Sequence, residues 1–179
     1  IKQKNDNFYI DGIIENKDAA LSKNFLKIVN FNFKNLNFDN TIFASTNKFN
    51  FEISRNFKLK NMSLNSEISL DHLKYERDNY ISEYFPKVNE EIVLKNHKIK
   101  LEYNNNLISI TGVGEIKLEE NFNKIDYILK KKNENFTIQS NLTLDGINLK
   151  KQDFIEVFFP TDNEYIFFKN QILNIKYNN

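Results

Sequence analysis

Apolar and polar residues alternate through much of the second half of the chain, between residues 96 and 149. Strict alternation places successive side chains on opposite faces of a β-strand, so this stretch predicts a row of antiparallel strands. A two-residue turn at Asn105-Asn106 would bring the flanking apolar residues onto one face, and asparagine tolerates the left-handed backbone that such a turn requires. The predicted pairs are Tyr103 with Ile108, Leu101 with Ile110, and Ile99 with Gly112.

The following strands can be registered in the same way. A turn at Lys132-Asn133 continues the alternation into a second hairpin, and a loop from Glu119 to Lys124 precedes it. The opposite face carries polar and charged side chains, with Ile128 as the exception, so the sheet has one apolar and one solvated face. The predicted pairs are Leu129 with Phe136, Tyr127 with Ile138, Ile125 with Ser140, Leu118 with Ile125, and Ile116 with Tyr127.

The first half of the chain carries weaker signals. Short alternating segments between residues 25 and 75, including one from Ile28 to Phe33, predict further strands. Before them, the sequence predicts a strand around Phe8-Tyr9-Ile10 and a helical turn or loop from Asn16 to Lys23. Residues 77–85 show helical spacing of aromatic and apolar positions, and Pro86 ends that segment.

An internal repeat with an offset of 74 residues joins the two halves. Such repeats stack into elongated sheets in which each unit mainly contacts its neighbours. We therefore expect one repetitive β domain over residues 1–179, with units at about 12–86 and 87–160 and the start of another at 161–179. The matched segments are Tyr84-Phe85-Pro86 with Phe158-Phe159-Pro160, Leu70-Asp71 with Leu144-Asp145, Lys95-Asn96 with Lys169-Asn170, and Phe51 and Ile53 with Ile125 and Tyr127.

The predicted fold class is mostly β. It is an elongated, curved antiparallel repeat sheet that forms an open groove, with short amphipathic helices between the repeats. The segments at residues 77–86 and 151–160 are these helices, and they would cover part of the apolar face or close its rim.

Composition adds mainly exclusions. With 25 basic and 24 acidic residues the net charge is +1, which gives no global electrostatic signal for nucleic acid or an anionic membrane. The absence of cysteine excludes disulfides, thiolate metal sites and cysteine nucleophiles. No apolar run approaches the ~20 residues that span a bilayer. The chain begins with Ile and shows no signal peptide, which predicts an internal or processed part of a longer protein.

No motif in the chain points to catalysis. Thr111-Gly112-Val113-Gly114 is followed by a strand pattern instead of a helix, so it indicates a bulge or close crossing within a sheet. Neither His72 nor His97 is matched by histidine in the repeat, which favours solvated or turn histidines over metal ligands. Glu119-Glu120 has no carboxylate partner at a catalytic spacing. We therefore predict no enzyme, catalytic residue, metal or cofactor.

Basic and aromatic residues give no clear sign of nucleic-acid binding. Lys130-Lys131-Lys132 is predicted at a hairpin tip, where it favours solubility, with lipid headgroups or nucleic acid as the alternative contacts. In sheets that bind nucleic acid, basic residues share the face of the stacking aromatics. Here they fall largely on the other face, so we predict core or lipid contact and no nucleic-acid partner.

Two further patterns carry a resemblance to a known family. Ile110 to Ile116 reads Ile-x-Gly-x-Gly-x-Ile, and Phe122 to Tyr127 reads Phe-x-x-Ile-x-Tyr. Together with the recurring Phe85-Pro86, Asn89-Glu90 and Lys95-Asn96, these motifs resemble repeats of the bacterial AsmA-like family, in particular its large YhdP-type members, relatives of TamB. The resemblance covers about residues 50–179 and includes no catalytic residue.

The resemblance implies a periplasmic segment of a Gram-negative protein that is anchored in the inner membrane. Phospholipids would travel along its hydrophobic β-groove toward the outer membrane, and both membranes would be reached through parts of the parent protein outside this chain. The competing hypothesis is a structural or interaction module, such as a β-sandwich, whose apolar face is its own closed core. A groove requires accessible apolar surface, whereas a sandwich requires a second sheet.

A lipid-binding face has a simple energetic basis. Each buried CH₂ contributes ~0.8 kcal/mol, so an acyl chain would bind an apolar face while its headgroup stays in water. The residues predicted to face the lipid are Ile99, Leu101, Tyr103, Ile108, Ile110, Ile116, Leu118, Ile125, Tyr127, Leu129, Phe136, Ile138, Leu142 and Leu144.

Overall fold

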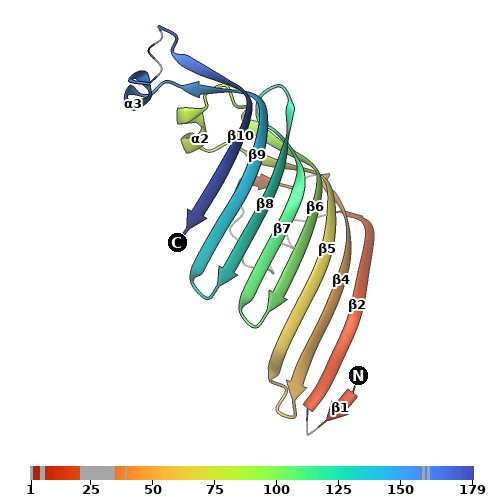
Figure 1. The fold of residues 1–179 in the computed structure, drawn as a ribbon. Coiled ribbons are helices and arrows are strands. Elements are labelled where there is room, and N and C mark those ends of the chain that lie inside the picture. Colours follow the sequence, from red (N-terminus) through yellow and green to blue (C-terminus); the bar gives the residue numbers. More distant parts are fainter. Residues whose placement is uncertain (1, 5–6, 21–34, 39, 159, 161) are drawn as a thin grey trace.

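A computed structural model describes residues 2–4, 7–20, 35–38, 40–158, 160 and 162–179. These residues form one ten-stranded sheet in which strands that follow one another along the chain lie side by side (Figure 1). The strand order is β1-β2-β4-β5-β6-β7-β8-β9-β10, and β3 pairs with β5 off this path. The sheet is open at both edges, which confirms the prediction of a mostly β chain with an open antiparallel sheet.

The described strands are mostly long, and the helices are short. The strands are β1 (Lys2–Lys4), β2 (Asn7–Ala20), β3 (Leu36–Asn37), β4 (Ile42–Ser54), β5 (Leu59–Glu76), β6 (Glu91–Asn104), β7 (Leu107–Lys117), β8 (Phe122–Lys132), β9 (Asn135–Lys150) and β10 (Tyr165–Asn178). The helices are α2 (Asn79–Tyr84) and α3 (Asp153–Glu156), within the two segments predicted to be helical.

The first half of the chain differs from its prediction. Residues 16–20 belong to β2 instead of a helical turn, and left-handed Asp18 (φ 49°) lies at an irregularity in the pairing with β4. The short segments expected between residues 42 and 75 merge into β4 and the 18-residue β5. The predicted strand at residues 28–33 lies outside the described residues.

The β6–β7 hairpin confirms its predicted register. Tyr103 pairs with Ile108, and Leu101 pairs with Ile110. Asn105 and Asn106 have φ values of 41° and 73°, so both turn residues adopt the left-handed backbone for which asparagine is suited.

The β8–β9 hairpin shifts by two residues from its prediction. Leu129 pairs with Ile138 and not with Phe136, and the turn is formed by Asn133 and Glu134. Asn133 has a φ of 55°, so the shift puts asparagine, instead of lysine, at the first turn position, where mirror-image turns require a positive φ. Because the shift is even, the face on which each side chain lies is unchanged.

The β7–β8 pairing shifts by four residues from its prediction. Tyr127 pairs with Gly112 instead of Ile116, and Ile125 pairs with Gly114 instead of Leu118. The Tyr127 ring lies directly over Gly112, where an added Cβ would be 2.2 Å from the ring Cζ. The register thus places a large ring where only glycine leaves room for it.

The 74-residue offset has a counterpart in the strand pairing. Leu70 pairs with His97 in β5–β6, and Leu144 pairs with Gln171 at the equivalent place in β9–β10. Asn96 and Asn170, one repeat apart, have φ values of 53° and 54°.

The offset does not extend upstream to β4 and β8. Phe49 opposes Leu64 as Leu129 opposes Ile138, so β4 and β8 correspond at an offset of 80 residues. The proposed matches of Phe51 with Ile125 and of Ile53 with Tyr127 are therefore wrong. The connection between β4 and β5 is longer than the β8–β9 turn, which accounts for the difference.

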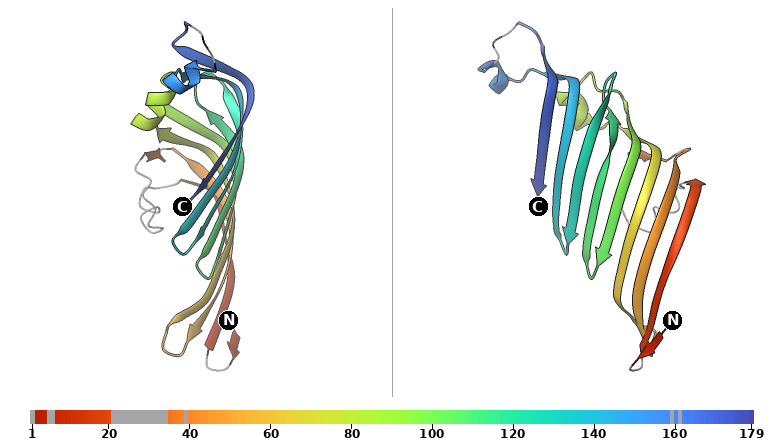
Figure 2. Two further views of the ribbon diagram at one scale, coloured as in Figure 1. Left: turned by 60° about the vertical axis from the view of Figure 1, so that its left-hand side comes forward. Right: turned by 45° about the vertical axis from the view of Figure 1, so that its right-hand side comes forward.

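Cross-strand partners share a face, so the registers divide the sheet into two surfaces. The apolar face contains the row Leu101, Ile110 and Leu129, whereas the polar face contains the row Glu102, Ser109 and Lys130. The strands bow when seen nearly edge-on, and α2 lies on the concave side (Figure 2).

The most deeply buried cluster lies on the apolar face beside α2. The Asp78 side chain caps α2 by accepting a hydrogen bond from the Ile81 N–H at 2.9 Å. Ile81 and Phe85 then pack against the cluster, so this segment covers one end of the face. The cluster consists of Val88, Ile92, Leu142, Leu144 and Ile147.

We expect Gly112→Ala to destabilise the protein by about 1–3 kcal/mol, because the new methyl group would collide with the Tyr127 ring. Combining it with Tyr127→Ala should recover part of the loss, and a double-mutant cycle by urea denaturation would measure this coupling. Val113→Ala, on the polar face of the same strand, is the control and should change stability by less than about 0.5 kcal/mol. Strictly additive effects of the first two substitutions would contradict the register.

Candidate functional site

The predicted lipid-facing residues all belong to the apolar face or its core. Those in β6, β7, β8 and β9 share this face by register. Leu118 lies in the turn after β7 and packs against the buried cluster beside α2. The errors in the predicted registers did not affect this assignment, because they were even numbers of residues.

The apolar face is continuous across the second half of the sheet. Leu101, Ile110, Leu129 and Ile138 form an unbroken row across β6 to β9, and Tyr177 of β10 extends it. Most side chains of this face are half-buried, because their neighbours on the same face shield them. At the β10 edge Leu173, Ile175 and Tyr177 are exposed.

Polar residues interrupt the same face in β2, β4 and β5. Asn47 and Ser66 occupy the row of Leu101, and Ser45 occupies the next row. Ser45 Oγ accepts hydrogen bonds from Asn16 Nδ2 at 3.0 Å and from Asn47 Nδ2 at 2.9 Å. The sequence analysis missed this polar group, although its alternation with Phe43 and Phe49 could have shown it. The continuous apolar surface therefore begins at β6.

A buried polar pair also lies on the apolar face. His97 is 3% exposed, and its Nδ1 lies 3.3 Å from the Tyr127 hydroxyl. Its Nε2 lies 3.1 Å from the backbone carbonyl of Glu115, and its ring covers Gly114. The prediction of a solvated or turn histidine is wrong for His97, because this residue continues the alternation of Ile99 and Leu101.

This geometry fits a neutral His97 that donates from Nε2 to the carbonyl and accepts the Tyr127 hydroxyl proton at Nδ1. Burial lowers the pKa of His97, while the hydrogen bond to the Glu115 carbonyl and the Glu115 charge oppose that shift. Burial raises the pKa of Tyr127 to about 12, so its hydroxyl stays protonated near neutral pH. The pair fixes the sheet at this point and contains no group activated for catalysis.

The largest hollow lies on the polar face and not on the predicted one. It has a volume of about 840 Å³ and crosses six strands, from β2 to β8. Small side chains such as Ala44, Ser69 and Thr111 line its middle, and charged side chains such as Lys98 and Glu67 stand around them. The row between, which includes Ile99 and Gly112, points to the other face and contributes backbone. A groove on the apolar face is thus not what this hollow represents.

The remaining candidates are placed as follows. Thr111 to Gly114 lie within β7, where the glycines accommodate the rings of Tyr127 and His97. His72 Nδ1 lies 3.0 Å from the Asp71 carboxylate. Lys130 to Lys132 adjoin the β8–β9 turn as predicted, and Lys131 opposes Phe136 on the apolar face.

Two searches of the described residues gave no candidates. No group of three or more His, Cys, Asp or Glu side chains there could hold a metal ion. Within the same residues, neither helix has the length and apolar character needed to cross a bilayer.

Comparison of the chain with protein-family models, curated proteins and solved structures gave no match. The resemblance to the AsmA-like family therefore stays a prediction from the motifs, and the function has to be argued from the sheet itself.

The stability of the protein should fall as the pH drops below 6.5. The folded state holds His97 with a lowered pKa, so the unfolded chain takes up the proton first and is stabilised by it. His97→Gln, which places the residue found at position 171 here, should flatten this dependence. Urea denaturation above and below pH 6.5 would measure it. The same pH slope in both proteins would contradict the buried, neutral histidine.

Proposed function

We propose that the apolar face binds the acyl chains of phospholipids, and that the chain is a non-enzymatic segment of a lipid-transfer protein. The observation that carries the proposal is the continuous apolar surface over β6 to β10, over which the described residues place no second sheet. The placement of the parent protein between two membranes rests on the AsmA-like resemblance alone.

The shape and chemistry of the face favour an extended, flexible ligand. The row from Leu101 to Tyr177 crosses five strands, and neighbouring strands lie roughly 4.8 Å apart, so the row is about 20 Å long. Each CH₂ that leaves water there contributes ~0.8 kcal/mol. Similar aliphatic side chains repeat along the row, so no single position would hold the chain tightly, which would allow a lipid to slide.

The ends of the face differ in a way that suits an amphipathic ligand. At the α2 end, Ile81 and Phe85 already bury the surface. At the other end, Lys131 opposes Phe136 and the Lys130–Lys132 run follows the edge of the sheet. Basic side chains at the open end could hold a phosphate group in water while the acyl chain lies on the apolar rows.

The packing beside α2 favours the competing hypothesis of a structural module. Five buried residues and the helix segment there form an ordinary closed core. If the described residues met a covering partner along the rest of the face, the surface would be an interface and no lipid would bind. The two hypotheses differ in what the isolated chain carries from the cell.

We expect phospholipid to co-purify with residues 1–179 prepared without detergent, as detected by mass spectrometry of an organic extract. Leu101→Lys with Ile110→Lys should abolish this binding, because two charges would enter the centre of the apolar row. Ser109→Lys with Thr111→Lys puts the same charges on the polar face of β7 and should keep the lipid.

Both double variants must show the β-sheet spectrum of the wild type by circular dichroism. Lipid that is absent from the wild type, or that survives the change on the apolar face, would overturn the proposal. Absence of lipid together with a monomer that binds no hydrophobic dye would favour the closed structural module.

A further inference from the structure

The β4–β5 hairpin ends in a tip that its own fold does not explain. Ser54 and Lys58 close it, because the Ser54 N–H donates to the Lys58 carbonyl at 3.0 Å and the Phe57 N–H donates to the Ser54 carbonyl at 2.9 Å. Three residues, 55–57, therefore form the loop. Such loops commonly end in one left-handed residue, which is usually glycine. Here that residue is Phe57, with a φ of 56°.

Phe57 is unfavourable in two independent respects. A bulky side chain in the left-handed region is a rare and strained choice. The eight other described non-glycine residues with positive φ are all Asn or Asp, which tolerate this backbone. The ring is also 88% exposed, so it gains no packing that would offset the strain. A residue that costs stability at an exposed tip indicates a role outside the fold.

The surroundings of Phe57 are basic. Lys58 and Lys60 are exposed, and Leu59 between them is 57% exposed. The sequence contains no acidic residue from Ile53 to Ser66. Glu52, just before the tip, is buried and accepts hydrogen bonds from the side-chain amides of Asn7 and Asn61. The exposed part of the tip is therefore apolar and cationic.

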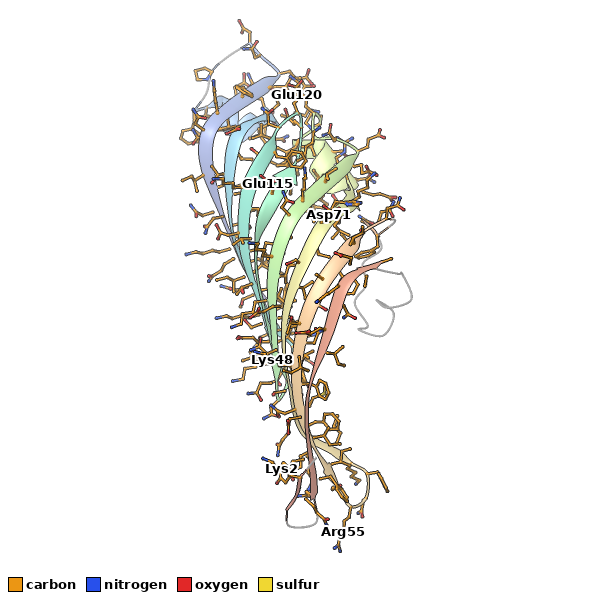
Figure 3. All side chains as sticks on the ribbon, turned by 90° about the vertical axis from the view of Figure 1, so that its right-hand side faces the viewer. Lys2, Lys48, Arg55, Asp71, Glu115 and Glu120 are labelled. Atoms are coloured by element: carbon orange, nitrogen blue, oxygen red, sulfur yellow. The ribbon has the colours of Figure 1, made fainter. Side chains whose placement is uncertain are left out.

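The tip also lies far from the acidic end of the molecule. Arg55 and Lys2 lie at one end of the sheet, and Glu120 lies at the other (Figure 3). The β6–β7 and β8–β9 turns are at the same end as the tip, and the latter adjoins Lys130 to Lys132. The hairpin reaches beyond these turns (Figure 1).

We propose that the β4–β5 tip, residues 54–60, docks on an anionic phospholipid surface. The Phe57 ring and Leu59 would enter the headgroup region, and Lys58 and Lys60 would lie at the lipid phosphates. An aromatic residue between lysines fits a bilayer surface, where apolar and anionic groups lie side by side. This site goes beyond the proposed function, because it contacts the membrane surface and does not involve the apolar face.

The decisive substitution is Phe57→Asn. Asparagine suits the left-handed position, so this variant should have an equal or higher melting temperature than the wild type. It should nevertheless bind about tenfold less to vesicles of three parts phosphatidylcholine and one part phosphatidylglycerol. Phe57→Leu keeps both the strain and the apolar side chain, and its binding should stay within about threefold of the wild type. Co-sedimentation measures the partition coefficient.

The charged residues can be tested against a matched site. Lys58→Gln with Lys60→Gln should lower binding on the order of tenfold, and added salt should remove the difference. Lys131→Gln with Lys132→Gln removes the same charge at the β8–β9 turn, which lacks an exposed aromatic residue, and should change binding by less than about threefold. Phe158→Asn, a 76% exposed ring outside the hairpin, should have no effect.

Each other result would overturn the proposal. A wild-type chain that binds neither this mixture nor phosphatidylcholine alone would assign the tip to a protein partner. Equal binding to both vesicles would exclude recognition of anionic lipid. Equal losses in the Phe57→Asn and Phe158→Asn variants would indicate general adsorption. The Leu101→Lys, Ile110→Lys variant should still bind vesicles, so failure of lipid extraction and failure of docking are distinguishable.

Discussion

Cross-strand pairing within one layer is the constraint on which this structure depends. The described residues contain no second sheet, so the side chains of the apolar face are shielded mainly by neighbours on adjacent strands. A register shift by one residue would turn a whole strand's apolar side chains to the other face. The same pairing also satisfies the backbone groups of strands as long as β5 and β9. Register therefore determines both hydrogen bonding and burial here.

Glycines and left-handed asparagines define that register at a few points. Gly112 leaves room for the Tyr127 ring, and Gly12 opposes Phe49 in the same way at the other side of the sheet. Asn96 puts His97 opposite Gly114 and on the apolar face, where its ring nitrogens find partners at Tyr127 and Glu115. Without those partners a buried imidazole would be costly, so the polar pair belongs to the packing of the face.

The two ends of the sheet have different physical character, and this difference connects the two proposals. At one end, the α2 segment buries the apolar rows against Val88 and Leu144. At the other end the turns are exposed and basic, and a strained aromatic ring extends from the longest hairpin. Between the ends lies an apolar surface without a partner among the described residues. A ligand with an acyl chain and a phosphate group matches both the surface and its open end.

The sequence by itself determined the features that depend on local chemistry. Alternation assigned the faces, Asn105-Asn106 fixed one hairpin, and Pro86 marked the end of the segment containing α2. Only the tertiary structure decided the β7–β8 and β8–β9 registers, the burial of His97 and the position of the hollow. Several even shifts keep the same face apolar, and the choice among them depends on which ring fits over which glycine. That fit joins residues distant in the chain, and local periodicity does not contain it.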